Sequence, residues 1–159
     1  MVCRLLEENE RTHFMTRRFD RRTDGAKSHL QCLCDTDHLD FSVADTDRYA
    51  HYFEVIDRLG LGHDALKQPF RRCAFNVMAV NRYAHLKDVA FVCDDYGDWT
   101  LAPAFDVIHS HNPPPAWSQR LQMSVNGKFE GVNRSDPLMA AERFRTPQRC
   151  RSSVRCAMR

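Results

Sequence analysis

The sequence predicts a single α+β domain that is mainly helical and carries a small β-hairpin after its central helices. Three observations lead to this fold class. The 159 residues leave room for one domain. Two central segments repeat apolar residues every three or four positions, which is typical of amphipathic helices. The period then shortens to that of strands over residues 89–102, where Gly97 marks a turn.

Short elements are expected before the central helices. Residues 15–19 favour a short strand, and residues 21–27, which include Asp24 and Gly25, favour a turn. Residues 28–41 mix apolar and acidic positions without a clear period. A short helix followed by an irregular acidic loop is therefore expected there.

Two helices are expected in the centre of the chain. The first spans residues 49–59, where Asp47 can cap its start and Gly60 supplies a left-handed stop. The second spans residues 64–79, with Pro69 in its first turns, where a missing N–H is tolerated best. Its expected buried face comprises Leu66, Phe70, Cys73, Ala74, Val77 and Met78. The two helices should pack against each other in the core.

Turn-forming and capping residues predict the elements that come after these helices. Residues 89–93 and 99–102 predict a hairpin, and Pro103 ends its ladder. Residues 113–115 are three prolines, which favour a stiff extended loop. Ser135 is expected to cap a last helix over residues 137–144.

The formal net charge of +2 comes from the C-terminal end of the chain. Residues 1–140 carry a net charge of −3, whereas residues 141–159 carry +5. Residues 145–159 have no helical or strand period, so a basic, disordered tail is expected. An arginine-rich nucleic-acid segment is the alternative, but no aromatic residue is interleaved for stacking, so direct nucleic-acid binding is not expected.

Apolar runs and cysteine usage also predict where in the cell the chain is found. The longest apolar run is only a few residues, which argues against a membrane-spanning helix, and charged residues interrupt the N-terminal segment where a secretory signal would be apolar. The seven cysteines are an odd number without regular spacing. They predict reduced thiols in a cytoplasmic protein rather than a disulfide framework.

Four potential zinc ligands fall within ten residues, namely His29, Cys32, Cys34 and His38. Their spacing is tighter than that of the usual paired-ligand zinc knuckle. The simpler interpretation is a packed cysteine beside surface histidines.

Two further pairs have a structural and a functional interpretation. His109 and His111 follow the hairpin and are either surface residues or part of a site. Trp99 and Trp117 are most simply packing residues of the core and of a loop.

The stretch with most chemical content combines the polar loop 81–88, the hairpin, and Asp106 just beyond its end. A loop that leaves a buried helix and a carboxylate that follows the next hairpin should face each other. Asp88 and Asp106 could supply hard oxygen ligands to Mg²⁺, and Lys87 could neutralise phosphate charge. The alternative is a solvated turn in which Lys87 and Asp88 are merely exposed.

Three blocks of the sequence resemble the HipA-like serine/threonine kinases, the toxins of bacterial toxin–antitoxin pairs. The main block, residues 75–107, reads FNVMAVNRYAHLKDVAFVCDDYGDWTLAPAFDV. The family segment reads approximately F-N-x-x-x-x-N-x-D-D-H-x-K-N-x-A-F, followed by W-x-L-x-P-A-Y-D. HFMTRRFDR (13–21) resembles the family's hinge strand, and QMSVNGKFEGVNRSDPLMAAERF (122–144) resembles the segment after the metal-binding Asp.

The resemblance implies a kinase-like C-terminal lobe over residues 1–144, with ATP and Mg²⁺ as ligands. By this resemblance Asp106 is the metal-binding Asp, preceded by Phe105 instead of Tyr, and Asp88 stands where an Asn shares the metal. His85 and Lys87 match the catalytic-loop H-x-K beside the phosphates. Nucleotide contacts are implied for Arg17, Arg18, Phe19, His85, Lys87 and Phe105, the first three through the main chain next to the adenine.

Two departures from the family pattern bear on activity. Tyr83 replaces the catalytic Asp two residues before the loop His. A Tyr side chain has a pKa near ~10 and a bulky ring, so it is not a ready proton acceptor at neutral pH. Asp88 in place of Asn keeps an oxygen ligand and adds negative charge beside the phosphates.

The family's glycine-rich loop and ATP-pairing Lys have no counterpart before residue 14. The expectation is therefore a truncated or frameshifted copy with impaired catalysis and exposed apolar surface where the other lobe should lie. Two hypotheses remain open. One is a kinase that acts on a protein Ser or Thr and pairs with a DNA-binding antitoxin. The other is a non-catalytic module that contacts an antitoxin or kinase partner, or an inactive gene remnant.

Overall fold

The computed structural model describes residues 2–40, 48–110 and 119–145. The N-terminal cap expected at Asp47, the prolines at 113–115, His111, Trp117 and the tail beyond residue 145 lie outside the described residues. None of the helices in the described ranges is long and apolar enough to cross a membrane.

The chain begins with a two-stranded antiparallel hairpin, β1 (Cys3–Glu8) and β2 (Arg11–Thr16). The turn between them is Asn9-Glu10, and both residues have positive φ, as a two-residue hairpin turn requires. The bounds expected for a strand at 15–19 are therefore wrong. β2 pairs with β1 directly after this turn, so the strand begins four residues earlier.

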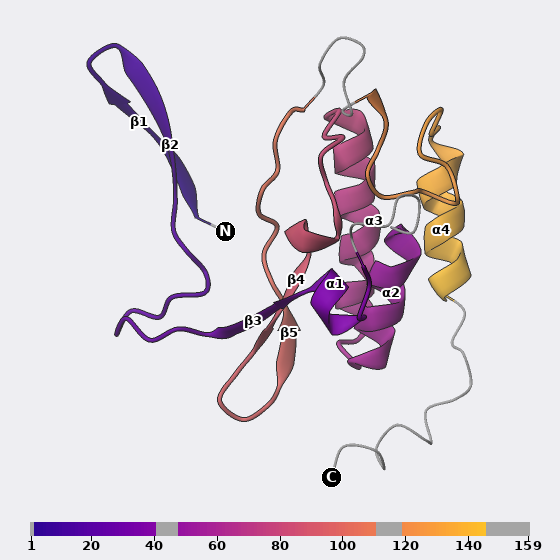
Figure 1. The fold of residues 1–159 in the computed structure, drawn as a ribbon, viewed down its shortest axis with the longest axis horizontal. Helices are drawn as coiled ribbons and strands as arrows, with labels where there is room; N and C mark the ends of the chain where they lie inside the picture. Colours follow the sequence, from indigo (N-terminus) through magenta and orange to yellow (C-terminus); the bar gives the residue numbers. More distant parts are fainter. Residues whose placement is uncertain (1, 41–47, 111–118, 146–159) are drawn as a thin grey trace.

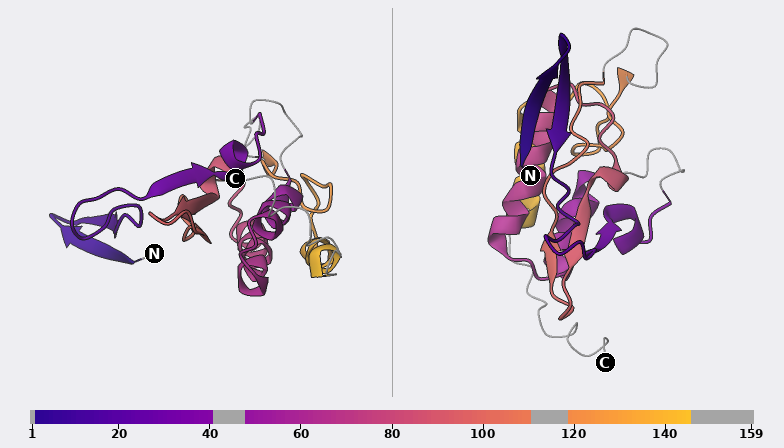
Figure 2. Two further views of the ribbon diagram at one scale, coloured as in Figure 1. Left: turned by 90° about the horizontal axis from the view of Figure 1, so that it is seen from below. Right: turned by 90° about the vertical axis from the view of Figure 1, so that its left-hand side faces the viewer.

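The β1–β2 hairpin stands apart from the helices, as Figures 1 and 2 show. Every residue of both strands is exposed. Leu5 lies opposite Phe14, and these side chains are 67% and 66% exposed. A two-stranded hairpin without a covering layer is at best marginally stable in water, so this apolar surface favours association.

We expect the chain to self-associate through this hairpin. Leu5→Ser combined with Phe14→Ser should shift sedimentation toward the monomer, because it removes the opposed apolar pair. The matched control is Tyr96→Ser, which removes an exposed aromatic ring (92%) from a distant turn. A wild-type chain that sediments as a monomer, or equal shifts in both variants, would contradict this expectation.

A three-stranded antiparallel sheet forms the next layer, in the order β3-β4-β5. The strands are β3 (His29–Cys32), β4 (Ala90–Cys93) and β5 (Trp99–Leu101). The hairpin expected over 89–102 is confirmed, with Gly97 at φ 87° in its turn. The expectation for 28–41 is only partly right: helix α1 (Leu33–Thr36) is present, but β3 precedes it. β3 has only four residues and is specified by pairing with β4 rather than by its own pattern.

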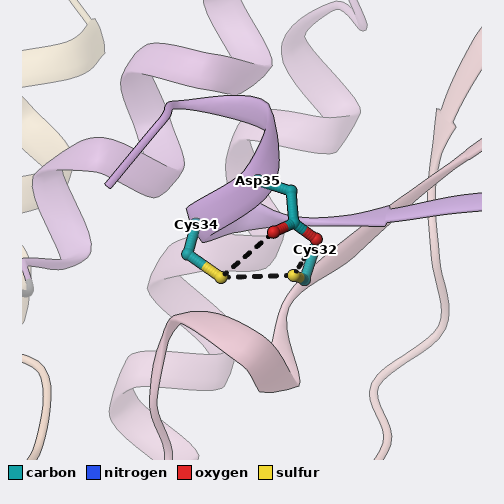
Figure 3. Close-up of side chains that lie close together, drawn as sticks. All are labelled: Cys32, Cys34 and Asp35. Carbon is teal, nitrogen blue, oxygen red and sulfur yellow. Dashed lines mark hydrogen bonds between the residues drawn. The ribbon is translucent and has the colours of Figure 1, made fainter. Parts of the chain in front are cut away.

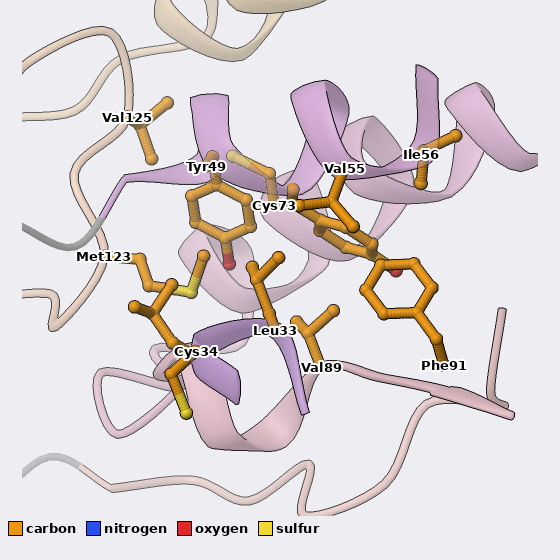
Figure 4. Packing of buried hydrophobic residues seen from close by; sticks show 12 residues of the cluster. Leu33, Cys34, Tyr49, Val55, Ile56, Cys73, Val89, Phe91, Met123 and Val125 are labelled. Atoms are coloured by element: carbon orange, nitrogen blue, oxygen red, sulfur yellow. The ribbon is translucent and has the colours of Figure 1, made fainter. Parts of the chain in front are cut away.

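The core lies between this sheet and two helices, α2 (Tyr49–Arg58) and α3 (His63–Met78). Figure 4 shows side chains from α1, α2, α3 and β4 converging there. The rings of Tyr52 and Phe91 meet edge to face, with centroids 6.4 Å apart. Gly60 has φ 66° and ends α2 as expected. Met78, expected in the core, is 84% exposed, because the buried face of α3 runs through Pro69, Cys73 and Asn76.

The chain ends in helix α4 (Ser135–Arg145), which packs on α2 and α3. Phe144 of α4 stacks on Phe53 of α2 with ring centroids 4.7 Å apart. The helix starts two residues earlier than expected, and its capping side chain is Asn133 rather than Ser135. The Asn133 Oδ1 accepts the N–H of Ser135 at 2.9 Å, and the Asp136 carboxylate accepts the N–H of Asn133 at 2.9 Å.

Val80 occupies the left-handed position that ends α3, with φ 54°. The N–H of Asn81 closes the turn on the carbonyl of Asn76 at 2.9 Å. A β-branched residue is unfavourable there, so Val80→Gly should raise the free energy of unfolding by about 1 kcal/mol. Urea denaturation measures this change. Val77→Gly, within the helix, is the matched control and should lower stability; stabilisation by both or by neither would contradict this account.

Candidate functional site

A pocket of about 340 Å³ opens between α3, the loop that follows it and the segment after β5. Its lining includes His85, Asp88, Phe105 and Asp106. The structure therefore brings together both carboxylates and one of the loop residues that the sequence singled out. The sheet explains this, because β4 starts just after Asp88 and β5 returns the chain to Asp106.

Asp88 is the most perturbed acid of the site. Its side chain is 9% exposed, and its Oδ2 accepts the main-chain N–H of His85 at 3.0 Å. Burial, together with charge repulsion from and hydrogen bonding to Asp106, raises the pKa of Asp88 to about 7. A buried carboxyl group beside a second carboxylate is suited to sharing a cation with it.

Asp106 is exposed and has a backbone φ of 51°. This left-handed conformation is uncommon for a residue with a side chain and is concentrated at functional positions. Arg72 of α3 contacts the segment that leads from β5 to Asp106. Its Nη2 donates a hydrogen bond to the Ala102 carbonyl at 2.7 Å. Helix α3 is thereby tied to the segment that presents Asp106.

His85 and Lys87 belong to a tight turn, η1 (Leu86–Asp88). The His85 Nδ1 accepts the N–H of Lys87 at 3.2 Å, and the Asp88 carboxylate caps the same turn from the other end. Burial and the nearby Lys87 charge lower the pKa of His85, so its ring is neutral at pH 7. The Lys87 side chain is exposed.

Tyr83 lies two residues before His85, and the two rings are 4.8 Å apart between centroids. Its main-chain N–H donates to the Ser110 Oγ at 2.8 Å. The ring of Tyr83 therefore lies beside the histidine of the loop.

The segment over residues 13–21, which resembles the family's hinge strand, contacts this region through an aromatic pair. Phe19 packs on Phe105 with ring centroids 5.7 Å apart. Arg18 forms two hydrogen bonds to Asp20, at 2.8 and 2.6 Å, and these hold the pKa of the Asp20 carboxyl at about 2. The main-chain N–H of Arg17 donates to the Val2 carbonyl at 3.0 Å. The Arg18 side chain is thus paired with Asp20 inside the 13–21 segment, whereas the Arg17 N–H is bonded to Val2, just before β1.

Sequence reasoning missed a chain of buried amides under the pocket. The Asn81 Nδ2 donates to the Asn76 Oδ1 at 3.1 Å, and the Asn76 Nδ2 donates to the Tyr49 hydroxyl at 2.9 Å. The Asn81 Oδ1 has no hydrogen-bond partner among the described residues. Both asparagines belong to the motif over residues 75–107, but only the way in which α3 ends brings them into contact under the pocket.

The four potential zinc ligands named from the sequence, and His109, do not form one group in the structure. His29 lies edge-on to the Trp99 ring, with centroids 5.7 Å apart. Cys32 and Cys34 are close together, but the group they form includes Asp35 and neither His29 nor His38. His109 contacts the Ala79 carbonyl through its Nδ1 at 3.2 Å, on the surface.

The described residues form a mainly helical α+β domain with two acidic residues, Asp88 and Asp106, presented on either side of a short hairpin. The family model of the HipA-like C-terminal domain matches residues 1–157. The chain therefore belongs to the HipA-like C-terminal domain family, which confirms the resemblance seen in the sequence. No curated protein sequence matches the chain significantly.

A solved structure with a similar fold is HipA of Shewanella oneidensis MR-1, in a complex with HipB and its operator DNA. The TM-score is 0.58 at 15% sequence identity, and the match covers 90% of this chain. The chain spans 42% of the length of that HipA. At this identity the likeness establishes the fold.

Proposed function

We propose that the chain is a HipA-type kinase lobe that holds Mg²⁺ and a nucleotide but transfers phosphate poorly. The observation that carries the proposal is the pairing of Asp88 with Asp106 in one pocket, with the Asp88 pKa raised to about 7. Hard carboxylate oxygens in this arrangement fit Mg²⁺. When bound, Mg²⁺ would neutralise charge on the β- and γ-phosphates.

The residues around this pair have distinct proposed roles. Lys87, exposed beside the pair, would face the phosphates, whereas neutral His85 would orient the loop by accepting the Lys87 N–H. The Phe19 and Phe105 rings would provide an apolar surface for the adenine. The acceptor for this reaction class is a protein Ser or Thr hydroxyl.

Tyr83 is the reason for the poor transfer. General base catalysis needs a group that accepts a proton near neutral pH, within hydrogen-bond reach of the attacking hydroxyl. A phenol is a weaker match to this requirement than a carboxylate, which accepts a proton readily at neutral pH.

The second candidate function is a non-catalytic binding module. It is favoured by the exposed β1–β2 hairpin, which offers apolar surface to another polypeptide. The solved neighbour is bound to HipB and operator DNA, so an antitoxin of the HipB kind is the proposed partner. In this reading DNA is contacted by the antitoxin.

A phosphoryl-transfer assay tests the proposal. The chain is incubated with radiolabelled ATP, Mg²⁺ and a general protein acceptor, alongside Tyr83→Asp and Asp106→Ala. We expect background label in the wild-type chain. Tyr83→Asp should incorporate more label, because the new carboxylate can accept the proton of the attacking hydroxyl. Strong labelling of the wild-type chain that Asp106→Ala abolishes would refute impaired catalysis.

A further inference from the structure

A second cluster of potential ligands lies at the junction of β3 and α1, outside the proposed nucleotide pocket. It consists of Cys32 at the end of β3 and Cys34 and Asp35 in the first turn of α1 (Figure 3). We propose that these three residues form a binding site for a thiophilic divalent cation of the zinc class.

The distances support a shared cation. The two Sγ atoms are 3.2 Å apart, and the Cys32 thiol donates to the Asp35 Oδ2 at 2.6 Å. One ligand atom from each residue lies within 4.8 Å of the others. Tetrahedral zinc with Zn–S bonds of about 2.3 Å separates two sulfurs by about 3.8 Å. The cluster therefore needs to open by less than 1 Å.

The chemistry of the ligand set selects the metal. Two thiolates favour zinc or another soft cation over Mg²⁺, and a carboxylate oxygen is an accepted third zinc ligand. Asp35 is exposed while Cys34 is 3% exposed. The site would thus have a buried sulfur side and an open side, where water completes the tetrahedron.

The site is independent of the histidines that suggested zinc in the sequence. Its three ligands come from four consecutive residues, so they are held together by the strand-to-helix junction itself. This junction is fixed by the Leu33 N–H, which donates to the Val89 carbonyl at 2.8 Å. A bound cation would therefore stabilise the segment beside the loop that carries Asp88.

Binding should depend on pH. Thiol protons must leave when a metal binds. Asp35, which accepts from Cys32, is the acidic group that faces it, and Cys34 is the neighbouring thiol. The apparent affinity should rise about tenfold or more per pH unit between pH 6 and 8, because at least one proton leaves per metal.

Cobalt(II) provides the test, since thiolate coordination gives it a charge-transfer absorption band. The full chain is titrated with Co²⁺ in a reducing, nucleotide-free buffer, and Zn²⁺ is added to displace the cobalt. We expect one Co²⁺ per chain, loss of the thiolate band in Cys32→Ser and Cys34→Ser, and at least tenfold weaker binding in Asp35→Asn. Cys93→Ser, at a half-buried cysteine outside the cluster, should bind like wild type.

Two results would overturn the proposal. One is the absence of stoichiometric Co²⁺ or Zn²⁺ binding by the folded wild-type chain, with folding verified by circular dichroism. The other is a thiolate band that survives in Cys32→Ser or disappears in Cys93→Ser. Because no nucleotide is present, neither result depends on the proposed phosphoryl transfer.

Discussion

Replacing Asp88 with asparagine is expected to raise the free energy of unfolding at pH 8 by on the order of 2 kcal/mol. In the folded chain the pKa of Asp88 is raised from 3.8 to about 7 by burial and by Asp106. A raised folded-state pKa contributes stability that is fully present below the unfolded-state pKa and is lost as pH rises through 7. Asparagine does not ionise, so the variant avoids this loss and can still accept the His85 N–H.

Urea denaturation at pH 8 and pH 5, with EDTA present, measures this effect. The gain at pH 5 should be less than half of the gain at pH 8, because Asp88 is already largely protonated in the folded wild-type chain. Asp98→Asn, at an exposed position in the β4–β5 turn, is the matched control and should change stability little at either pH. A pH-independent gain, or a less stable Asp88→Asn variant at pH 8, would show that Asp88 is not strained by its burial.

Replacing Asp106 with asparagine is expected to weaken Mg²⁺ binding at least tenfold. The change keeps the size of the side chain and removes one of the two negative charges that face the cation. Wild-type affinity should also fall below pH 7, where Asp88 takes up a proton and ceases to be an anionic ligand. Mn²⁺ can replace Mg²⁺ as a probe, with free Mn²⁺ measured by electron paramagnetic resonance.

A charge-matched control separates the contribution of Asp106 to metal binding from a general loss of negative charge. Asp98→Asn removes the same charge elsewhere and should bind Mn²⁺ like wild type. Equal Mn²⁺ affinity in Asp106→Asn and wild type would remove Asp106 from the metal site. Affinity that does not change between pH 8 and pH 6 would likewise contradict the role given to Asp88.

The central part of the fold was predictable because its local patterns agree with its packing. The helical period over residues 49–79 and the Gly97 turn correspond to α2, α3 and the β4–β5 hairpin. The β1–β2 hairpin and β3 were missed or misplaced for a common reason. Their strands are short and two-sided, and their positions follow from pairing partners rather than from an alternation of their own.

The candidate site was predictable to the extent that chain connectivity determines it. A loop before a hairpin and a carboxylate after it must return to the same end of the sheet, which is why Asp88 and Asp106 could be paired from the sequence. The Asn76–Asn81 contact could not be, because it depends on how α3 ends at Val80. The structure groups Asp35, and neither His29 nor His38, with the two cysteines, since β3 directs His29 to Trp99 while α1 brings Asp35 to Cys32.

The most direct test of the proposed function is calorimetric titration of the wild-type chain with ATP in the presence and absence of Mg²⁺. We expect binding of one ATP per chain that requires Mg²⁺ and is lost in Asp106→Asn, with no ATP hydrolysis or protein labelling above background. Binding that is equally strong without Mg²⁺, or the absence of any binding by the folded chain, would contradict a metal-dependent nucleotide site at Asp88 and Asp106.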